Sequence, residues 1–229
     1  MCGRFAIAHI PGFFARFMLH DPEVELQPRY NIAPAQQVPV IVSESPNRLV
    51  VMRWGLVPFW AKDQKIGSRL INARGETITT SPAFRSSIKK RRCLVPATGF
   101  YEWMKQKGRK TPYYCHLKDD AFFAFAGLYD RWRSPDGTIL LSFTVVTTSP
   151  NALISKAHNR MPVILRREDE AQWLSPGQLD ATDLKRIFMP YPAGLMEMYP
   201  VSPSVGNPRV ESEEFVRPLS RIVHLPSGK

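Results

Sequence analysis

The stretch CLVPATGFYEWM, residues 93–104, has the β-branched and aromatic composition of an extended strand. Three later stretches share this composition, and Asp136-Gly137 between the last two marks a hairpin turn. These stretches are TPYYCHL (111–117), AFFAFAGLYDRW (121–132) and TILLSFTVVTT (138–148). Strands joined by short turns favour a largely antiparallel sheet.

The remaining segments add helices to this sheet. Interspersed strands and helices without a repeat or linker favour one α+β domain over residues 1–229, with an irregular tail from about residue 211. Two further strands are predicted at 38–45 and 48–55, a loop at 29–37, and helices at 81–92, 167–175 and 181–189, the first of them opened by Ser81 and Pro82.

Bulk composition narrows the function. A net charge of +11 over 229 residues is typical of a protein that meets a polyanion, although a basic enzyme is the alternative. Three cysteines without CxxC spacing argue against both a disulfide framework and a zinc site, so we expect no metal and no cofactor. No apolar run reaches eighteen residues and no signal-peptide core is present, which predicts a cytoplasmic protein without a membrane partner.

The first five residues, MCGRF, suggest a nucleophile. If Met1 is removed, Cys2 carries a free α-amine and a thiol on adjacent carbons, with ordinary pKa values of about 7.7–8.0 and about 8.5. Such a 1,2-aminothiol captures an aldehyde as a Schiff base, which the sulfur then closes to a thiazolidine ring. The simpler interpretation of Cys2 is that it is only a small residue after the initiator methionine, without a chemical role.

Three polar residues are acid–base or orienting candidates. Glu102 lies among aromatic residues, where desolvation raises the pKa of a carboxyl group, although a polar strand face would also explain it. His158 in KAHNRMP is a proton shuttle or a structural histidine, and Asn72 in INARGE is suited to orient an intermediate.

Basic and aromatic clusters offer a nucleic-acid surface. KKRR (89–92) and KQKGRK (105–110) are suited to phosphates, or are simply solvated. Phe59 and Trp60 lie between basic segments and could stack on bases or pack in the core.

Taken in order, six motifs and a VGN in the tail resemble the SRAP family, the SOS response-associated peptidases. The motifs are MCGRF, RYNIAP, WGLVPFW, INARGET, GFYEW and AHNRMP, and together with the VGN of the tail the matches run from residue 2 to about 207. The resemblance implies an α+β fold, a single domain around a largely antiparallel, barrel-like β-sheet with flanking short helices. It also implies a protein that recognises abasic sites in single-stranded DNA and crosslinks to them through the N-terminal cysteine as a thiazolidine.

The resemblance further implies residue roles. Cys2 would be the nucleophile, Asn72 would orient the reacting centre, Glu102 would be the acid/base, and His158 would assist sugar-ring opening or proton transfer. The residues implied to contact DNA or line its pocket are Arg4, Arg74, Arg160, Phe59, Trp60, Asn31, Pro34, Trp103 and Thr147.

The expected partner is single-stranded DNA with abasic sites, or a single-strand/double-strand junction, bound by a cytoplasmic, nucleoid-associated monomer. The family name leaves a thiol peptidase limited to autoproteolytic N-terminal processing as the alternative. A non-catalytic nucleic-acid-binding module is a third possibility, based on charge alone.

Overall fold

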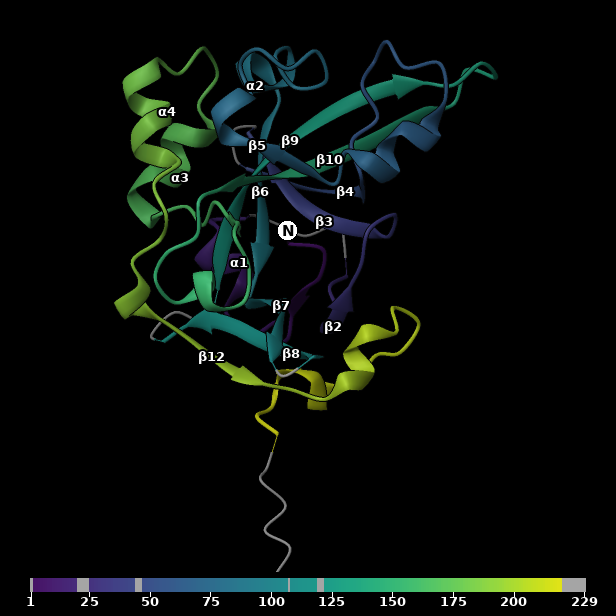
Figure 1. Ribbon diagram of the computed structural model, residues 1–229. Coiled ribbons are helices and arrows are strands. Elements are labelled where there is room, and N and C mark those ends of the chain that lie inside the picture. Colours follow the sequence, from purple (N-terminus) through teal and green to yellow (C-terminus); the bar gives the residue numbers. More distant parts are fainter. Residues whose placement is uncertain (1, 20–24, 44–46, 107, 119–121, 220–229) are drawn as a thin grey trace, which may run out of the picture.

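The computed structural model describes residues 2–19, 25–43, 47–106, 108–118 and 122–219. A closed barrel of five strands forms one half of the molecule (Figure 1). Antiparallel pairs link β4 to β3, β3 to β6, β6 to β9 and β9 to β10, and a parallel pair between β10 and β4 closes the ring. The barrel strands are β3 (Gln37–Val42), β4 (Arg48–Trp54), β6 (Arg92–Ala97), β9 (Phe123–Arg133) and β10 (Ile139–Thr148). The predicted α+β, largely antiparallel, barrel-like fold is confirmed.

Two short strands extend the barrel wall at the end of β10. β5 (Asn72–Arg74) pairs in parallel with β10, and β11 (Met161–Pro162) pairs antiparallel with Thr147 and Thr148. Segments distant in sequence therefore meet at one end of β10.

A second, antiparallel sheet lies against the barrel, in the order β12-β8-β7-β1-β2 (Figure 1). Its strands are β1 (Phe5–Ile7), β2 (Arg29–Ile32), β7 (Gly99–Gln106), β8 (Arg109–Leu117) and β12 (Met196–Pro200). The chain after β12 runs beneath this sheet, on the side away from the barrel.

The stretch 93–104 belongs to both sheets, because β6 leads into β7 with only Thr98 between them. Thr98 fixes this passage: its N–H donates to Ala6 O at 2.8 Å, and its Oγ1 accepts from the Ala8 N–H at 2.9 Å. The Tyr114 hydroxyl lies 3.1 Å from the same Oγ1. One extended segment thus joins the barrel to the sheet that holds the N-terminal strand.

Apolar side chains divide into two cores, one on each face of the second sheet. The larger core fills the barrel and includes Phe5 of β1, whose ring contacts Trp54 at 5.1 Å and Phe125 at 5.8 Å between centroids. The smaller core joins Tyr101 and Tyr114 to the C-terminal segment. Burial of Phe5 in the barrel fixes the position of the residues just before it.

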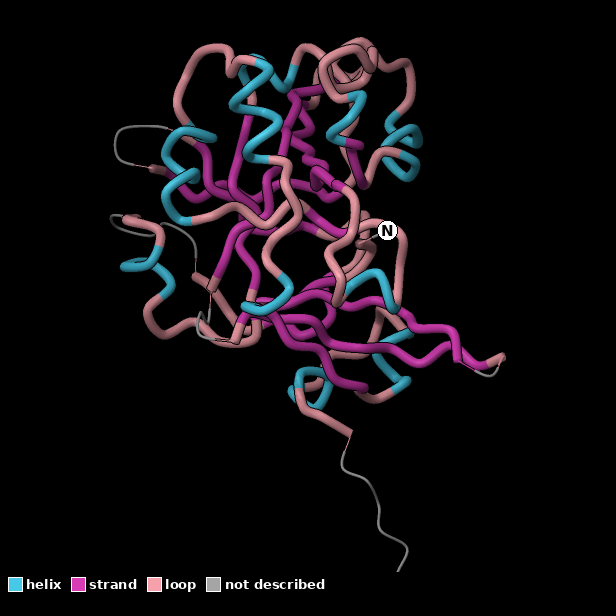
Figure 2. Tube along the Cα trace, turned by 60° about the vertical axis from the view of Figure 1, so that its left-hand side comes forward, coloured by secondary structure: helices cyan, strands magenta, loops and turns pink. Residues whose placement is uncertain are grey.

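Short helices flank the sheets, and no helix in the described ranges is long and apolar enough to cross a membrane (Figure 2). Helices α3 and α4 pack together through an ion pair between Asp169 and Arg186. The helices are α1 (Phe13–Arg16), α2 (Ser87–Lys90), α3 (Arg167–Leu174) and α4 (Ala181–Ile187). Turns of 3₁₀ helix span Gln64–Arg69, Gly75–Thr77, Ile154–Lys156, Ala193–Leu195, Pro203–Gly206 and Glu213–Val216.

Several sequence predictions need correction. The expected loop at 29–37 contains β2, because β1 supplies a pairing partner that local propensity does not show. The helix expected over 81–92 is reduced to α2, since the buried Arg92 donates to the carbonyls of Ile88 and Trp173 and begins β6 instead. The irregular tail expected from 211 stays a prediction, since its described part holds one 3₁₀ turn and its last ten residues lie outside the described ranges.

Other predictions are confirmed. The strands expected at 38–45 and 48–55 are β3 and β4, although their connection at 44–46 lies outside the described residues. The hairpin turn between β9 and β10 contains Gly137 at φ +88°, a left-handed conformation that suits glycine. The helices at 167–175 and 181–189 are α3 and α4.

We predict that Gly99→Ala destabilises the protein by about 1–3 kcal/mol, the usual cost of overpacking. A Cβ at this position would lie 2.2 Å from the Tyr114 ring, in the buried junction between β7 and β8. Urea unfolding measures the change. Gly194→Ala is the matched control, because nothing lies within 4 Å of its added Cβ. Equal stabilities for the two variants would contradict the packing argument.

Candidate active site

Cys2 lies inside the protein, between the barrel and the second sheet. Its side chain is fully buried in the larger core, and its thiol donates a hydrogen bond of 3.9 Å to Arg4 O. Burial, with the charge of Glu102 as a second cause, raises the pKa of the Cys2 thiol well above its ordinary value. The sulfur is therefore protonated at neutral pH and needs a base before it can attack.

Glu102 of β7 is a buried carboxyl group whose charge acts on the Cys2 thiol. Side chains alternate along β7, so Phe100 and Glu102 face the barrel while Tyr101 and Trp103 face the C-terminal segment. Glu102 is 3% exposed, and burial raises the pKa of its carboxyl group to about 7. A carboxyl group with this pKa accepts or releases a proton readily near neutrality.

Asn72 holds the main chain of Cys2. Its Nδ2 donates to Cys2 O at 2.9 Å, and the pairing of β5 with Val145 fixes its place on the barrel wall. The Asn72 Oδ1 atom is buried and has no hydrogen-bond partner among the described residues. The structure therefore brings Cys2, Asn72 and Glu102 together, one from each of three distant segments.

His158 lies on the loop before β11, at the end of β10 where β5 also pairs. Its Nδ1 accepts a hydrogen bond of 3.0 Å from the Arg160 main-chain N–H. Burial lowers the pKa of His158 below its ordinary value, so the ring is neutral at pH 7. The Arg160 side chain donates to Thr147 O at 2.7 Å and forms a two-pronged ion pair with Glu76.

Arg4 is turned into the protein. Its Nη1 donates to Asn31 Oδ1 and to Val205 O, both at 2.6 Å, and its guanidinium lies 6.0 Å from the centre of the Trp103 ring. Asn31 is fully buried, and its Nδ2 donates to two carbonyls of the C-terminal segment, those of Asn207 and Val210. These contacts give Arg4, Asn31 and Trp103 a structural role in fastening the segment that carries the VGN motif, and DNA contact by them stays a prediction.

Other predicted contact residues line the surface. Phe59 and Trp60 are 58% and 48% exposed, and Arg74 is exposed while Pro34 is half-buried. The core alternative for the two aromatic residues is wrong. They line a hollow of about 500 Å³ together with Pro82, Arg85 and Ser86.

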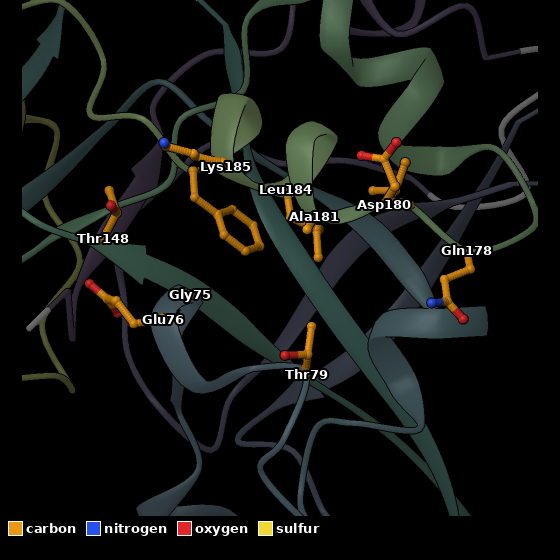
Figure 3. Close-up of a pocket in the computed structure, with 11 residues that line it drawn as sticks. Gly75, Glu76, Thr79, Thr148, Gln178, Asp180, Ala181, Leu184 and Lys185 are labelled. Carbon is orange, nitrogen blue, oxygen red and sulfur yellow. The ribbon is translucent and has the colours of Figure 1, made fainter.

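Arg85 and Glu76 also line hollows near the expected site residues, and the sequence did not single them out. Arg85 lies in the segment expected to be helical, and Glu76 lies inside the INARGET motif, whose asparagine and arginine were singled out instead. Glu76 also lines a largely apolar pocket of about 500 Å³ against α4 (Figure 3). Thr148 contributes to that pocket as well, so it adjoins the end of β10.

The basic runs are dispersed in the structure. Lys89 and Lys90 are exposed at the end of α2, but Arg91 pairs with Asp130 at 3.2 Å and Arg92 is buried.

Within the described ranges, no group of three or more His, Cys, Asp or Glu side chains is arranged to hold a metal ion.

Comparisons with known proteins identify the family of this chain. The family model for the SOS response associated peptidase (SRAP) matches residues 1–208. The chain is 43% identical over 221 residues to the abasic site processing protein YoqW of Bacillus subtilis, with 94% of this chain and 99% of that protein covered. It is 30% identical to the abasic site processing protein HMCES of Mus musculus, covering 89% of this chain and 68% of that protein. A crystal structure of a protein from Bacteroides thetaiotaomicron superposes with a TM-score of 0.87 at 29% identity, covering 96% of this chain and all of that one.

We predict that Glu102→Gln stabilises the protein at pH 8 by about 2 kcal/mol and has little effect at pH 5. The native state holds the Glu102 proton more tightly than the unfolded chain does, since burial raises the pKa from 4.5 to about 7. Folding therefore becomes less favourable as the pH rises between these values, and the amide removes that cost. Urea unfolding at both pH values measures the change.

The matched control is Glu214→Gln, which changes an exposed glutamate and should show no such gain at pH 8. A Glu102→Gln protein that is equally stable relative to wild type at both pH values would contradict the raised pKa.

Proposed function

The chain belongs to the SOS response associated peptidase family, and from that premise we propose that it processes abasic sites in DNA by forming a covalent crosslink through Cys2. The observation that carries the proposal is the set of buried Cys2, half-buried Asn72 and buried Glu102, in which a carboxyl group with a pKa of about 7 interacts electrostatically with the thiol. The relatives named above as abasic site processing proteins support the substrate.

The chemistry requires a free α-amine on Cys2, so every residue ahead of it is removed first. The ring-opened abasic sugar offers an aldehyde at C1′. The α-amine adds to this carbon, and loss of one water gives a Schiff base. The Cys2 sulfur then attacks the same carbon, its proton moves to the nitrogen by way of a base, and a five-membered thiazolidine results. No oxidant or reductant is needed.

Glu102 acts in both steps of this reaction, formation of the Schiff base and closure of the thiazolidine ring. In its acid form it protonates the departing hydroxyl of the first adduct, and the carboxylate so produced takes the thiol proton as the sulfur attacks. A pKa of about 7 keeps both forms populated. Asn72 holds the Cys2 main chain by its bond to Cys2 O, which limits the orientations of the amine.

The substrate is single-stranded DNA or a strand junction, since a duplex would hinder access to C1′. An abasic site has no base to unstack, so intact nucleotides can be excluded by size. The charge of +11 supports binding to the phosphate backbone without sequence preference. The exposed Arg74 and Arg85 are better placed for this contact than the inward Arg4.

Self-removal of the residues ahead of Cys2 is the second candidate activity. The family description contains the word peptidase, and the same thiol and carboxyl group suit a single cleavage at the protein's own terminus. Turnover of a separate peptide would be needed to extend this activity beyond processing.

We predict that Cys2→Ala abolishes the stable thiazolidine crosslink of the processed protein to an abasic single-stranded oligonucleotide, because the alanine α-amine can form only the reversible Schiff base. Cys2→Ser keeps the amine but lacks the sulfur, so its adduct should persist on a denaturing gel only after borohydride reduction of the Schiff base. Intact mass before and after mixing reports both the N-terminal residue and the adduct.

The control is Cys93→Ala, which replaces another fully buried cysteine and should leave the crosslink yield unchanged. A full yield from a protein whose Cys2 amine is acylated would contradict the ring-closing scheme.

We predict that replacing Phe59 and Trp60 together by alanine weakens binding to abasic single-stranded DNA by about tenfold or more, since a stacked base contributes about 1–3 kcal/mol. Fluorescence anisotropy measures the affinity. Met189→Ala is the control, because this exposed apolar side chain, 61% accessible, lies outside the aromatic hollow. Unchanged affinity in the double variant would exclude a stacking role.

A further inference from the structure

We propose that Glu76 is a positioning residue, which acts through Arg160 to hold the His158 ring in a single tautomer for the crosslinking reaction. The inference rests on the proposed function for its kinetic consequence, but the tautomer itself can be observed without DNA. The sequence did not single out Glu76, and it gave no sign of the contacts that link Glu76 to His158.

The first link is the ion pair between Glu76 and Arg160. Arg160 Nη1 donates to Glu76 Oε1 at 2.5 Å and Nη2 donates to Oε2 at 2.8 Å, a two-pronged arrangement that fixes the orientation of the guanidinium. The hydrogen bond from Arg160 also lowers the pKa of Glu76, so the carboxylate stays ionised near neutral pH.

The second link fastens Arg160 to the end of β10. Its Nη2 also donates to Thr147 O at 2.7 Å and lies 3.3 Å from Thr147 Oγ1. Thr147 pairs with Arg74 of β5 and with Pro162 of β11. The guanidinium thus ties the loop that carries His158 to β10, the strand with which β5 pairs.

The third link reaches the histidine ring. The main-chain N–H of Arg160 donates to His158 Nδ1 at 3.0 Å, so this nitrogen is the acceptor. A neutral imidazole with an accepting Nδ1 carries its proton on Nε2. His158 is therefore presented as a hydrogen-bond donor through Nε2, which suits polarising a sugar oxygen.

These contacts also hold the Arg160 side chain against the protein. Its side chain is 17% exposed, its Nε atom is buried, and both terminal nitrogens already donate within the protein. A DNA phosphate would have to displace the Glu76 carboxylate to obtain the same two-pronged contact. These contacts give Arg160 a positioning role within the protein, and the phosphate contact expected of it stays a prediction.

Nitrogen-15 NMR of the histidine rings gives the direct test, with His158→Ala used to assign one signal among the five histidines. In the wild-type protein we expect unprotonated Nδ1 and protonated Nε2 for His158 at pH 7.5. Glu76→Gln should shift the signals toward a mixture of tautomers. An unchanged His158 pattern in Glu76→Gln would overturn the proposal.

Crosslinking rates at saturating abasic DNA give the second test. Glu76→Gln should slow the reaction by about tenfold, within the contribution of a positioned acid–base group, while affinity for intact single-stranded DNA stays the same. In the His158→Ala background the same substitution should cause no further loss. An additional tenfold loss in that background, or a changed affinity for intact DNA, would overturn the proposal.

Glu197→Gln is the matched control, since Glu197 pairs with His116 and has similar side-chain exposure, 51% against 54% for Glu76. It should change neither the His158 signals nor the rate. If Glu76→Gln fails to fold, Arg160→Lys breaks the same two-pronged contact and is measured in the same way. Absence of any crosslink in the wild-type protein would refute the proposed function, whereas the NMR result would still judge the role of Glu76.

Discussion

The passage of one extended segment from the barrel into the second sheet is the constraint on which the site depends. Thr98 marks this passage and is hydrogen-bonded to Ala6 of β1 and to Ala8 just after that strand. Four residues later the same segment presents Glu102 to the space where β1 brings Cys2. A shift of one residue in β7 would turn Glu102 toward the C-terminal segment and separate it from the thiol.

Burial of that carboxyl group is favourable for chemistry and unfavourable for folding. The desolvation that raises the Glu102 pKa to about 7 also makes its ionised form costly inside the protein. Aromatic packing of Phe5 in the barrel holds the N-terminal strand in place against this cost. The reactive end of the chain is thus fixed by apolar contacts that take no part in the reaction.

Charge is divided between the interior and the surface. Arg4, Arg92 and Arg160 direct their guanidinium groups to internal carbonyls and side chains, where they join segments distant in sequence. The exposed cations, among them Arg74 and Arg85, remain for a polyanion. A net charge of +11 therefore supports nucleic-acid binding as a whole, but it does not identify which arginines make the contact.

The sequence by itself determined the strand pattern, the α+β class, the hairpin at Gly137 and, through its ordered motifs, the family and the candidates Cys2 and Glu102. These are local properties of composition, turn chemistry and motif order. Only the tertiary structure decided that Arg4 and Arg160 point inward, that β2 exists, and that Glu76 lies at the start of a chain of contacts to His158. Such contacts join residues as far apart as Arg4 and Val205, which are 201 positions apart, and local sequence carries no record of pairing that only the packed barrel and sheet create.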